Sequence, residues 1–236
     1  MRLSSTQISL VIVFAALQVL LATLPLSITI GVTGSITLGA AGGPLIGILL
    51  GPTLGGLAAL IGSLIGCFIN PSGAIFGFLT VIPPLLGAFG TGCIRVKKGY
   101  IIGGVILALL LIFYAHPFGR EAYIFPWLSI IAMIVAFSPL ASLAGSAFAS
   151  EKISKIFFGA IISSFVGIMA DHISGCAIAI WYFSPALTPE IWYLAMPIYP
   201  IERAIALIIS SVIAAPIYQR LKKAGLSFTK QASGGS

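Results

Sequence analysis

The residues of this chain that could do chemistry are few, and the sharpest candidates lie within apolar sequence. Asp171 and His172 are adjacent in an apolar run from about Lys155 to Trp181. An ionisable residue in such a run is costly, so it usually faces the protein interior or water and has a partner. Two roles are open for this pair: an interhelical hydrogen bond that holds the bundle together, or contact with a substrate or ion.

Glu202 and Arg203 begin the last apolar run of the chain. Neighbours on a helix point about 100° apart, so these two side chains need not pair with each other. Arg203 could pair with Asp171 across a helix bundle, or it could hold a carboxylate of an anionic substrate in a bidentate contact. Both side chains could instead extend toward the membrane surface.

Further candidates lie in turns and aromatic segments. Asn70, Ser72 and Thr80 surround a turn, and ordinary turn chemistry is the alternative role for them. Five aromatic residues could stack on a planar ring or anchor the chain at the membrane interface: Trp127, Trp181, Tyr182, Trp192 and Tyr199. We predict a substrate site built from Asn70, Ser72, Thr80, Trp127, Asp171, His172, Trp181, Tyr199, Glu202 and Arg203.

The same residue types argue against a metal centre. His116 is the other histidine of the chain, and no cluster of metal ligands is visible. The cysteines, Cys67, Cys93 and Cys176, lie in or beside apolar runs without CxxC spacing, which is typical of small buried side chains. We therefore expect no metal, no cofactor and no enzymatic activity in this chain.

Composition identifies the elements that must position these residues. Hydrophobic residues make up 59% of the chain and charged residues 7%, whereas a soluble domain carries about 25% charge. The mean hydropathy of +1.16 agrees with this. We predict an all-α, multi-pass protein of the cell membrane, surrounded by lipid. The net charge of +7 does not indicate a nucleic-acid partner, because the basic residues form short clusters between apolar runs.

Small residues recur at every fourth position in the segment 43–66, GPLIGILLGPTLGGLAALIGSLIG. A four-residue step keeps one face of a helix nearly aligned, and in lipid such a face lets two helix backbones approach closely. We predict close helix packing at Gly43, Gly47, Gly51, Gly55, Ala59 and Ser63.

Apolar runs separated by helix breakers predict eight segments, or six to eight membrane spans. The second and third are short and meet at a bend, Gly51-Pro52, so they could be two antiparallel spans or a broken pair that does not fully cross. Their ranges are 6–27, 35–50, 53–69, 74–94, 100–115, 126–148, 155–181 and 200–219.

Basic clusters before the first segment and after the fourth, sixth and eighth predict that both termini are cytoplasmic. The run from Ile8 to about Leu26 is too long for a typical signal peptide, so we expect a retained first helix. Residues 1–224 are expected to form one membrane domain and residues 225–236 a flexible tail.

The segment 51–92 resembles the substrate-specific (S) component of energy-coupling-factor transporters. In that family a Gly-Pro-x-x-Gly begins a glycine-spaced helix, a Pro/Gly turn follows, and a Gly-Phe-Thr-like segment opens the next helix. The matching residues here are Gly51, Pro52, Gly55, Pro71, Gly73, Gly77, Phe78, Thr80, Gly87 and Gly90. The last span also resembles the closing helix of the family.

The resemblance implies a subunit that captures a small molecule, such as a vitamin or related micronutrient, and delivers it through a transmembrane coupling subunit. A pair of partner ATPases would hydrolyse ATP, since this chain has no Walker A pattern. Two alternatives remain open. The chain could be a stand-alone secondary transporter or channel with its pathway along 35–69. It could also be an intramembrane enzyme or scaffold subunit that uses Asp171 and His172.

Overall fold

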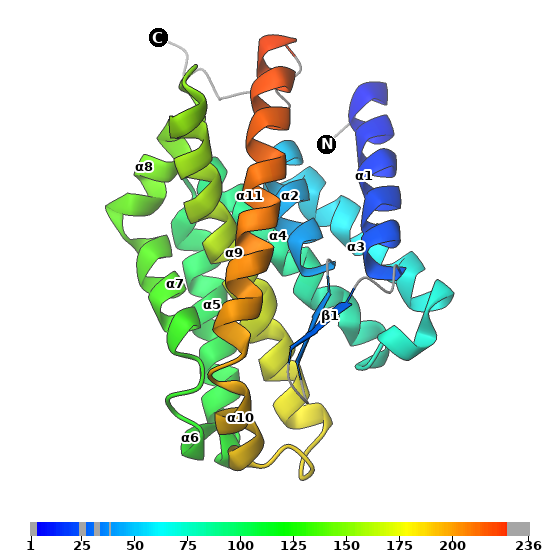
Figure 1. The fold of residues 1–236 in the computed structure, drawn as a ribbon, viewed down its shortest axis with the longest axis vertical. Coiled ribbons are helices and arrows are strands. Elements are labelled where there is room, and N and C mark those ends of the chain that lie inside the picture. The colour runs from blue at the N-terminus through cyan, green and yellow to red at the C-terminus, as the bar shows by residue number, and fades with distance from the viewer. Residues whose placement is uncertain (1–3, 24–26, 31–33, 38, 226–236) are drawn as a thin grey trace.

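The computed structural model describes residues 4–23, 27–30, 34–37 and 39–225, and these fold into a bundle of helices (Figure 1). The longer helices are α1 (Ser5–Thr23), α2 (Gly39–Leu50), α3 (Pro52–Ile69), α4 (Ile82–Arg95), α5 (Gly99–Ala115), α7 (Trp127–Phe137), α8 (Pro139–Ala147), α9 (Ile153–Tyr182) and α11 (Tyr199–Lys223). Short elements connect them: η1 (Pro71–Gly73), η2 (Gly77–Val81), α6 (Pro117–Glu121) and α10 (Pro189–Ala195). Arg2 and the expected flexible tail from residue 226 onward lie outside the described residues.

A short β-hairpin interrupts the helices between α1 and α2. Strand β1 (Ser27–Ile30) pairs with strand β2 (Gly34–Thr37) in antiparallel register. The expectation of helices over 6–27 and 35–50 is therefore wrong at these ends, because α1 stops at Thr23 and α2 starts at Gly39. The hairpin sequences, SITI and GSIT, contain β-branched residues that favour strands over helices.

Helix α2 is the most enclosed part of the bundle. Each of its residues from Ala41 to Leu50 is buried. A Cβ atom added at Gly43 would lie 3.1 Å from the carbonyl oxygen of Pro84, so the backbones of α2 and α4 are in close approach. Small residues at this contact allow the approach, as expected for helices in a membrane.

The series of small residues at every fourth position from Gly43 to Ser63, which we call the glycine ladder, does not continue along one helix face. Gly51 separates α2 from α3 with φ of 80°, a left-handed conformation that L side chains rarely adopt. Pro52 then occupies the first turn of α3, where its missing N–H is tolerated. The ladder folds back on itself, and a Cβ added at Gly55 would lie 3.2 Å from the Cα of Gly47. Ala59 and Ser63 are buried on α3.

Five helical segments in the described part of the chain are long and apolar enough to cross a membrane: α1, α3, α4 with η2, α9 and α11. The pair α7 and α8 is bent by 73° and would make a sixth span. Helix α2 has 12 residues, or about 18 Å, and is too short to cross a hydrocarbon core of about 30 Å. The chain is thus a helical bundle suited to a membrane, and the short α2 agrees with a broken pair rather than with two full spans over segments 35–50 and 53–69.

Basic and aromatic segments lie at opposite ends of the bundle. Lys222, near the end of α11, donates to the carbonyl oxygen of Ser150 in the turn between α8 and α9. Helices α6 and α10 lie at the other end (Figure 1), where the Tyr193 hydroxyl donates to the carbonyl oxygen of Glu121 at 2.7 Å. We call the end with Lys222 and the α8–α9 turn the basic end. Its basic residues are Arg95, Lys97, Lys98, Lys152, Lys155, Arg220, Lys222 and Lys223.

Candidate functional site

A cavity of about 870 Å³ lies between α1, the start of α2, the turn after α3, α9, α10 and the start of α11. Its lining brings together residues that are up to 185 positions apart in the sequence, from Gln18 to Arg203. Seven of the ten predicted site residues line it: Asn70, Thr80, Asp171, His172, Tyr199, Glu202 and Arg203. We call this space the central cavity.

An ion pair crosses one wall of the central cavity. Nη1 of Arg203 lies 3.4 Å from Oδ2 of Asp171, and the two side chains are 22% and 15% exposed. Asp171 reaches this position because α4 packs tightly against α9. A Cβ added at Gly87 would lie 3.2 Å from the Cβ of Asp171, so any larger residue there would push the helices apart.

Aromatic side chains form a second part of the wall. The His172 ring stacks on the Tyr199 ring with centroids 4.6 Å apart and planes 17° apart. The Tyr199 hydroxyl donates to the carbonyl oxygen of Phe125 at 2.9 Å. The Phe125 ring in turn meets the Trp192 ring at 4.8 Å. These contacts hold four rings against one another, so the wall is rigid and largely apolar.

Three buried polar atoms of the cavity wall have no hydrogen-bond partner among the described residues. They are Oε1 of Gln18, Nε1 of Trp192 and Nε of Arg203. The other end of the Gln18 amide is used, because its Nε2 donates to Oγ of Ser63 at 3.4 Å. An unpartnered buried donor or acceptor costs about 1–3 kcal/mol. These atoms lie just behind the surface of the cavity wall, and the groups that the wall carries at its surface include the partly exposed Arg203 and Asp171 side chains.

Two acidic side chains affect the net charge of the central cavity. Asp171 and Glu202 both line it, with Arg203 as the cation between them in the wall. Two carboxylates against one guanidinium leave the wall with one excess negative charge when all three are ionised. A neutral, zwitterionic or cationic molecule fits this balance better than an anion does.

Asn70 and Thr80 also line the cavity, but their side-chain oxygens accept hydrogen bonds within the turn. Oδ1 of Asn70 accepts from the Ser72 hydroxyl at 2.7 Å and from the backbone N–H of Gly73 at 3.3 Å. Oγ1 of Thr80 accepts from the backbone N–H of Phe76 at 3.0 Å. These are turn contacts, so Asn70 and Thr80 shape the rim of the cavity.

Three predicted residues are not among those that line the central cavity. Ser72 is exposed and donates to Asn70. Trp181 is 53% exposed, and its Nε1 donates to the carbonyl oxygen of Ile112. It lies ten residues after Asp171, which places it about 80° away around α9. Trp127 is 40% exposed, and Phe125 is the residue of that segment that lines the cavity.

Other lining residues were not predicted: Gln18, Phe76, Phe125 and Cys176. Gln18 could have been identified from the sequence as a candidate site residue, because it is a polar residue inside an apolar run. Cys176 lies one helical turn after His172, with Sγ 3.7 Å from Nε2 of the imidazole. No group of three or more His, Cys, Asp and Glu side chains in the described chain could hold a metal ion. The arrangement is suited to binding an organic molecule through its rings and hydrogen bonds.

Comparison with known proteins gives one relative. The chain is 30% identical over 163 residues to an uncharacterized protein of the archaeon Methanocaldococcus jannaschii, a match that covers 65% of this chain and 51% of that protein. The chain thus spans about half the length of the curated relative that it matches. No family model and no solved structure matches it.

Proposed function

We propose that this chain is the membrane-embedded substrate-binding subunit of an importer for a small organic molecule, with the role of an S component. The observation that carries the proposal is the central cavity, whose wall combines an ion pair, stacked rings and a second carboxylate, that of Glu202. Binding pockets have this character, being mostly apolar with a few convergent polar groups. The bundle is suited to the cell membrane, and the basic end would face the cytoplasm.

The wall of the central cavity supports a planar ligand with polar edges. Flat aromatic side chains favour a ring, and the partly exposed Arg203 guanidinium favours acceptor atoms on it. The Asp171 and Glu202 carboxylates favour a donor, such as an amine or hydroxyl. We propose a neutral, zwitterionic or cationic ring compound, of the size of a vitamin or related micronutrient.

The proposed importer needs partners. A transmembrane coupling subunit would receive the substrate, and a pair of ATPases would supply the energy, since the chain carries no Walker A pattern. The chain itself would then need no cofactor and would catalyse no reaction.

Native mass spectrometry of the purified protein tests the binding role. We expect a copurifying small molecule that is retained by the wild-type protein and lost when Arg203 is replaced by Gln. Uptake of that molecule by cells should require an ATPase that copurifies with this chain. A chain that retains no small molecule, and whose host takes up its candidate substrates without any ATPase, contradicts the proposal.

A stand-alone secondary transporter is a second candidate, and helix α2 favours it. This helix starts at the central cavity with Gly39 and ends at the basic end, where Nη1 of Arg95 donates to the carbonyl oxygens of Ile48 and Leu49. Short buried helices that start at a substrate site occur in such transporters. Substrate flux into liposomes that contain this chain alone would favour this candidate over the first.

A further inference from the structure

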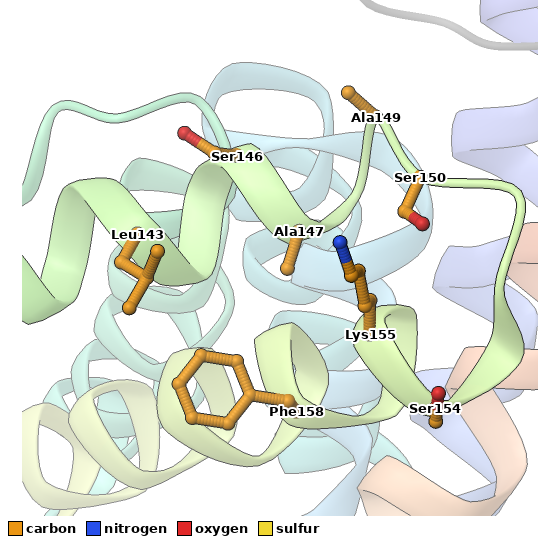
Figure 2. A pocket seen from close by; sticks show the side chains of 8 residues that line it. All are labelled: Leu143, Ser146, Ala147, Ala149, Ser150, Ser154, Lys155 and Phe158. Atoms are coloured by element: carbon orange, nitrogen blue, oxygen red, sulfur yellow. The ribbon is translucent and has the colours of Figure 1, made fainter.

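A second cavity, of about 580 Å³, lies between α8 and the first turns of α9 (Figure 2). It is at the basic end of the bundle, and its lining residues are separate from those of the central cavity. We call it the α8–α9 groove. Its lining residues are Leu143, Ser146, Ala147, Ala149, Ser150, Ser154, Lys155 and Phe158.

The α8–α9 groove has a polar side and an apolar side. Figure 2 shows the Lys155 ammonium in the space between Ala147 and Ser150, while Leu143 and Phe158 lie on the other side of the groove. The Ser150 hydroxyl accepts from the backbone N–H of Lys152 at 3.1 Å, which leaves its own proton free to donate. The groove therefore places an ammonium and a hydroxyl donor beside an apolar surface.

Lys155 has no carboxylate partner among the described residues. The acidic residue of the α8–α9 turn is Glu151, and Nζ of Lys222 lies 2.9 Å from its Oε1. This contact lowers the pKa of the Glu151 carboxyl, so Glu151 stays ionised and paired with Lys222. The positive charge of Lys155 is left for a ligand from outside the chain.

The groove is held open by the backbone around it. Helix α8 is bent by 73° from α7 and packs against α9. Lys222 fixes the turn between α8 and α9 by donating to the carbonyl oxygens of Ala149 and Ser150. Ligand binding would therefore need little ordering of the protein, which reduces its entropic cost.

The apolar side of the groove opens toward lipid. Leu143 is 59% exposed and Phe158 is 37% exposed. These side chains belong to apolar helices of a membrane bundle, so their exposed surfaces face acyl chains. A soluble anion would satisfy Lys155 but would leave this surface unused. A molecule that is anionic at one end and apolar at the other fits both sides.

We propose that the α8–α9 groove binds one anionic phospholipid of the leaflet at the basic end. Its phosphate contacts Lys155 and Ser150, and one acyl chain lies along Leu143 and Phe158. Basic pockets at this level of a membrane protein are suited to anionic head groups. The site is independent of the central cavity and of the importer role.

Lipid titration followed by native mass spectrometry tests the proposal on the full chain in detergent. The probes are phosphatidylglycerol and phosphatidylcholine with identical acyl chains. We expect the first bound phosphatidylglycerol to be retained in preference to phosphatidylcholine. Replacing Lys155 with Gln should weaken phosphatidylglycerol binding about fivefold and leave phosphatidylcholine binding unchanged. Replacing Lys155 with Arg should preserve the preference, because the charge is kept.

Lys98 supplies the matched control. It is exposed at the same end of the bundle but lies outside the groove. If Lys98→Gln weakens lipid binding as much as Lys155→Gln does, general surface charge explains the effect and the groove proposal is wrong. Equal retention of the two lipids by the wild-type protein also overturns it. So does displacement of the lipid by an equal concentration of soluble glycerol phosphate.

Discussion

Arg203 and Asp171 join α11 to α9 through a single contact of 3.4 Å between Nη1 and Oδ2. The pair lines the central cavity, and Nε of Arg203 has no partner among the described residues. One side of the guanidinium is thus anchored to the bundle, while the side chain as a whole remains 22% exposed in the cavity wall. This division allows the same residue to hold two helices together and to select a bound molecule.

Replacing Asp171 with Asn should destabilise the bundle by about 1–3 kcal/mol. Removing one member of a buried pair costs about 3–5 kcal/mol, and partial exposure to the cavity reduces this. The double variant Asp171→Asn, Arg203→Gln should be more stable than the single one, because no uncompensated charge remains. Thermal unfolding in detergent, followed by tryptophan fluorescence, measures both.

The exposed pair of Lys222 and Glu151 is the control for this prediction. Glu151 is 72% exposed in its side chain, so Glu151→Gln should leave the unfolding temperature unchanged. Equal stability losses in Glu151→Gln and Asp171→Asn would mean that Asp171 has no special role in the bundle.

Replacing Gly167 with Ala should destabilise the bundle by about 1–3 kcal/mol, the usual cost of overpacking. An added Cβ would meet the Thr91 hydroxyl and would lie 2.6 Å from the carbonyl oxygen of Gly87, so α4 and α9 would have to separate. Gly104 is the matched control, since nothing lies within 4 Å of a Cβ added there. Gly104→Ala should not lower the unfolding temperature. If both variants behave alike, close approach of α4 to α9 is not what stabilises the bundle.

Replacing Trp192 with Phe should reduce retention of the copurifying small molecule about tenfold, while the protein stays folded. The change keeps a ring against Phe125 but makes it smaller, so the cavity wall loses apolar contact surface. A loss of about 1–1.5 kcal/mol of this contact accounts for the effect. Native mass spectrometry measures retention. Trp181→Phe, outside the cavity lining, should retain the molecule fully. Loss in both variants would point to a general aromatic effect.

Cysteine labelling of whole cells should place the basic end in the cytoplasm. We expect a membrane-impermeant maleimide to label Tyr123→Cys in intact cells. Lys98→Cys should be labelled only after the cells have been permeabilised. Tyr123 is 62% exposed and Lys98 is also exposed, and the two lie at opposite ends of the bundle. The positive-inside rule sets their sides. The native cysteines are replaced by Ala beforehand. The reverse labelling pattern would invert the orientation and the proposed direction of capture.

Part of the candidate site could be predicted because charge in apolar sequence is costly. Asp171 and Arg203 stand out in their runs for this reason, and they do meet in one wall. The roles of Asn70 and Trp181 could not be read in the same way. Turns and membrane interfaces also favour Asn and Trp, so residue type alone does not separate a cavity wall from the outer surface.

The helical bundle could be predicted from composition, but the shape of α2 could not. Its glycine ladder indicates close packing in either one long helix or two helices. Backbone geometry at Gly51, with φ of 80°, decides that the ladder folds back and that α2 stays buried and short. The pairing of strands 27–30 and 34–37 could not be predicted either, since their apolar β-branched residues resemble helix sequence in a membrane.

The amino-acid sequence by itself determined that this protein is a bundle of apolar helices with most of its basic residues at one end, because hydropathy and charge are properties of each segment alone. Only the tertiary structure decided which side chains share the central cavity. Gln18 lies on α1, whereas Trp192 and Arg203 lie on α10 and α11 near the other end of the chain, and all three line the same space. Helix rotation and approach depend on all the packed surfaces together, so no single segment encodes them.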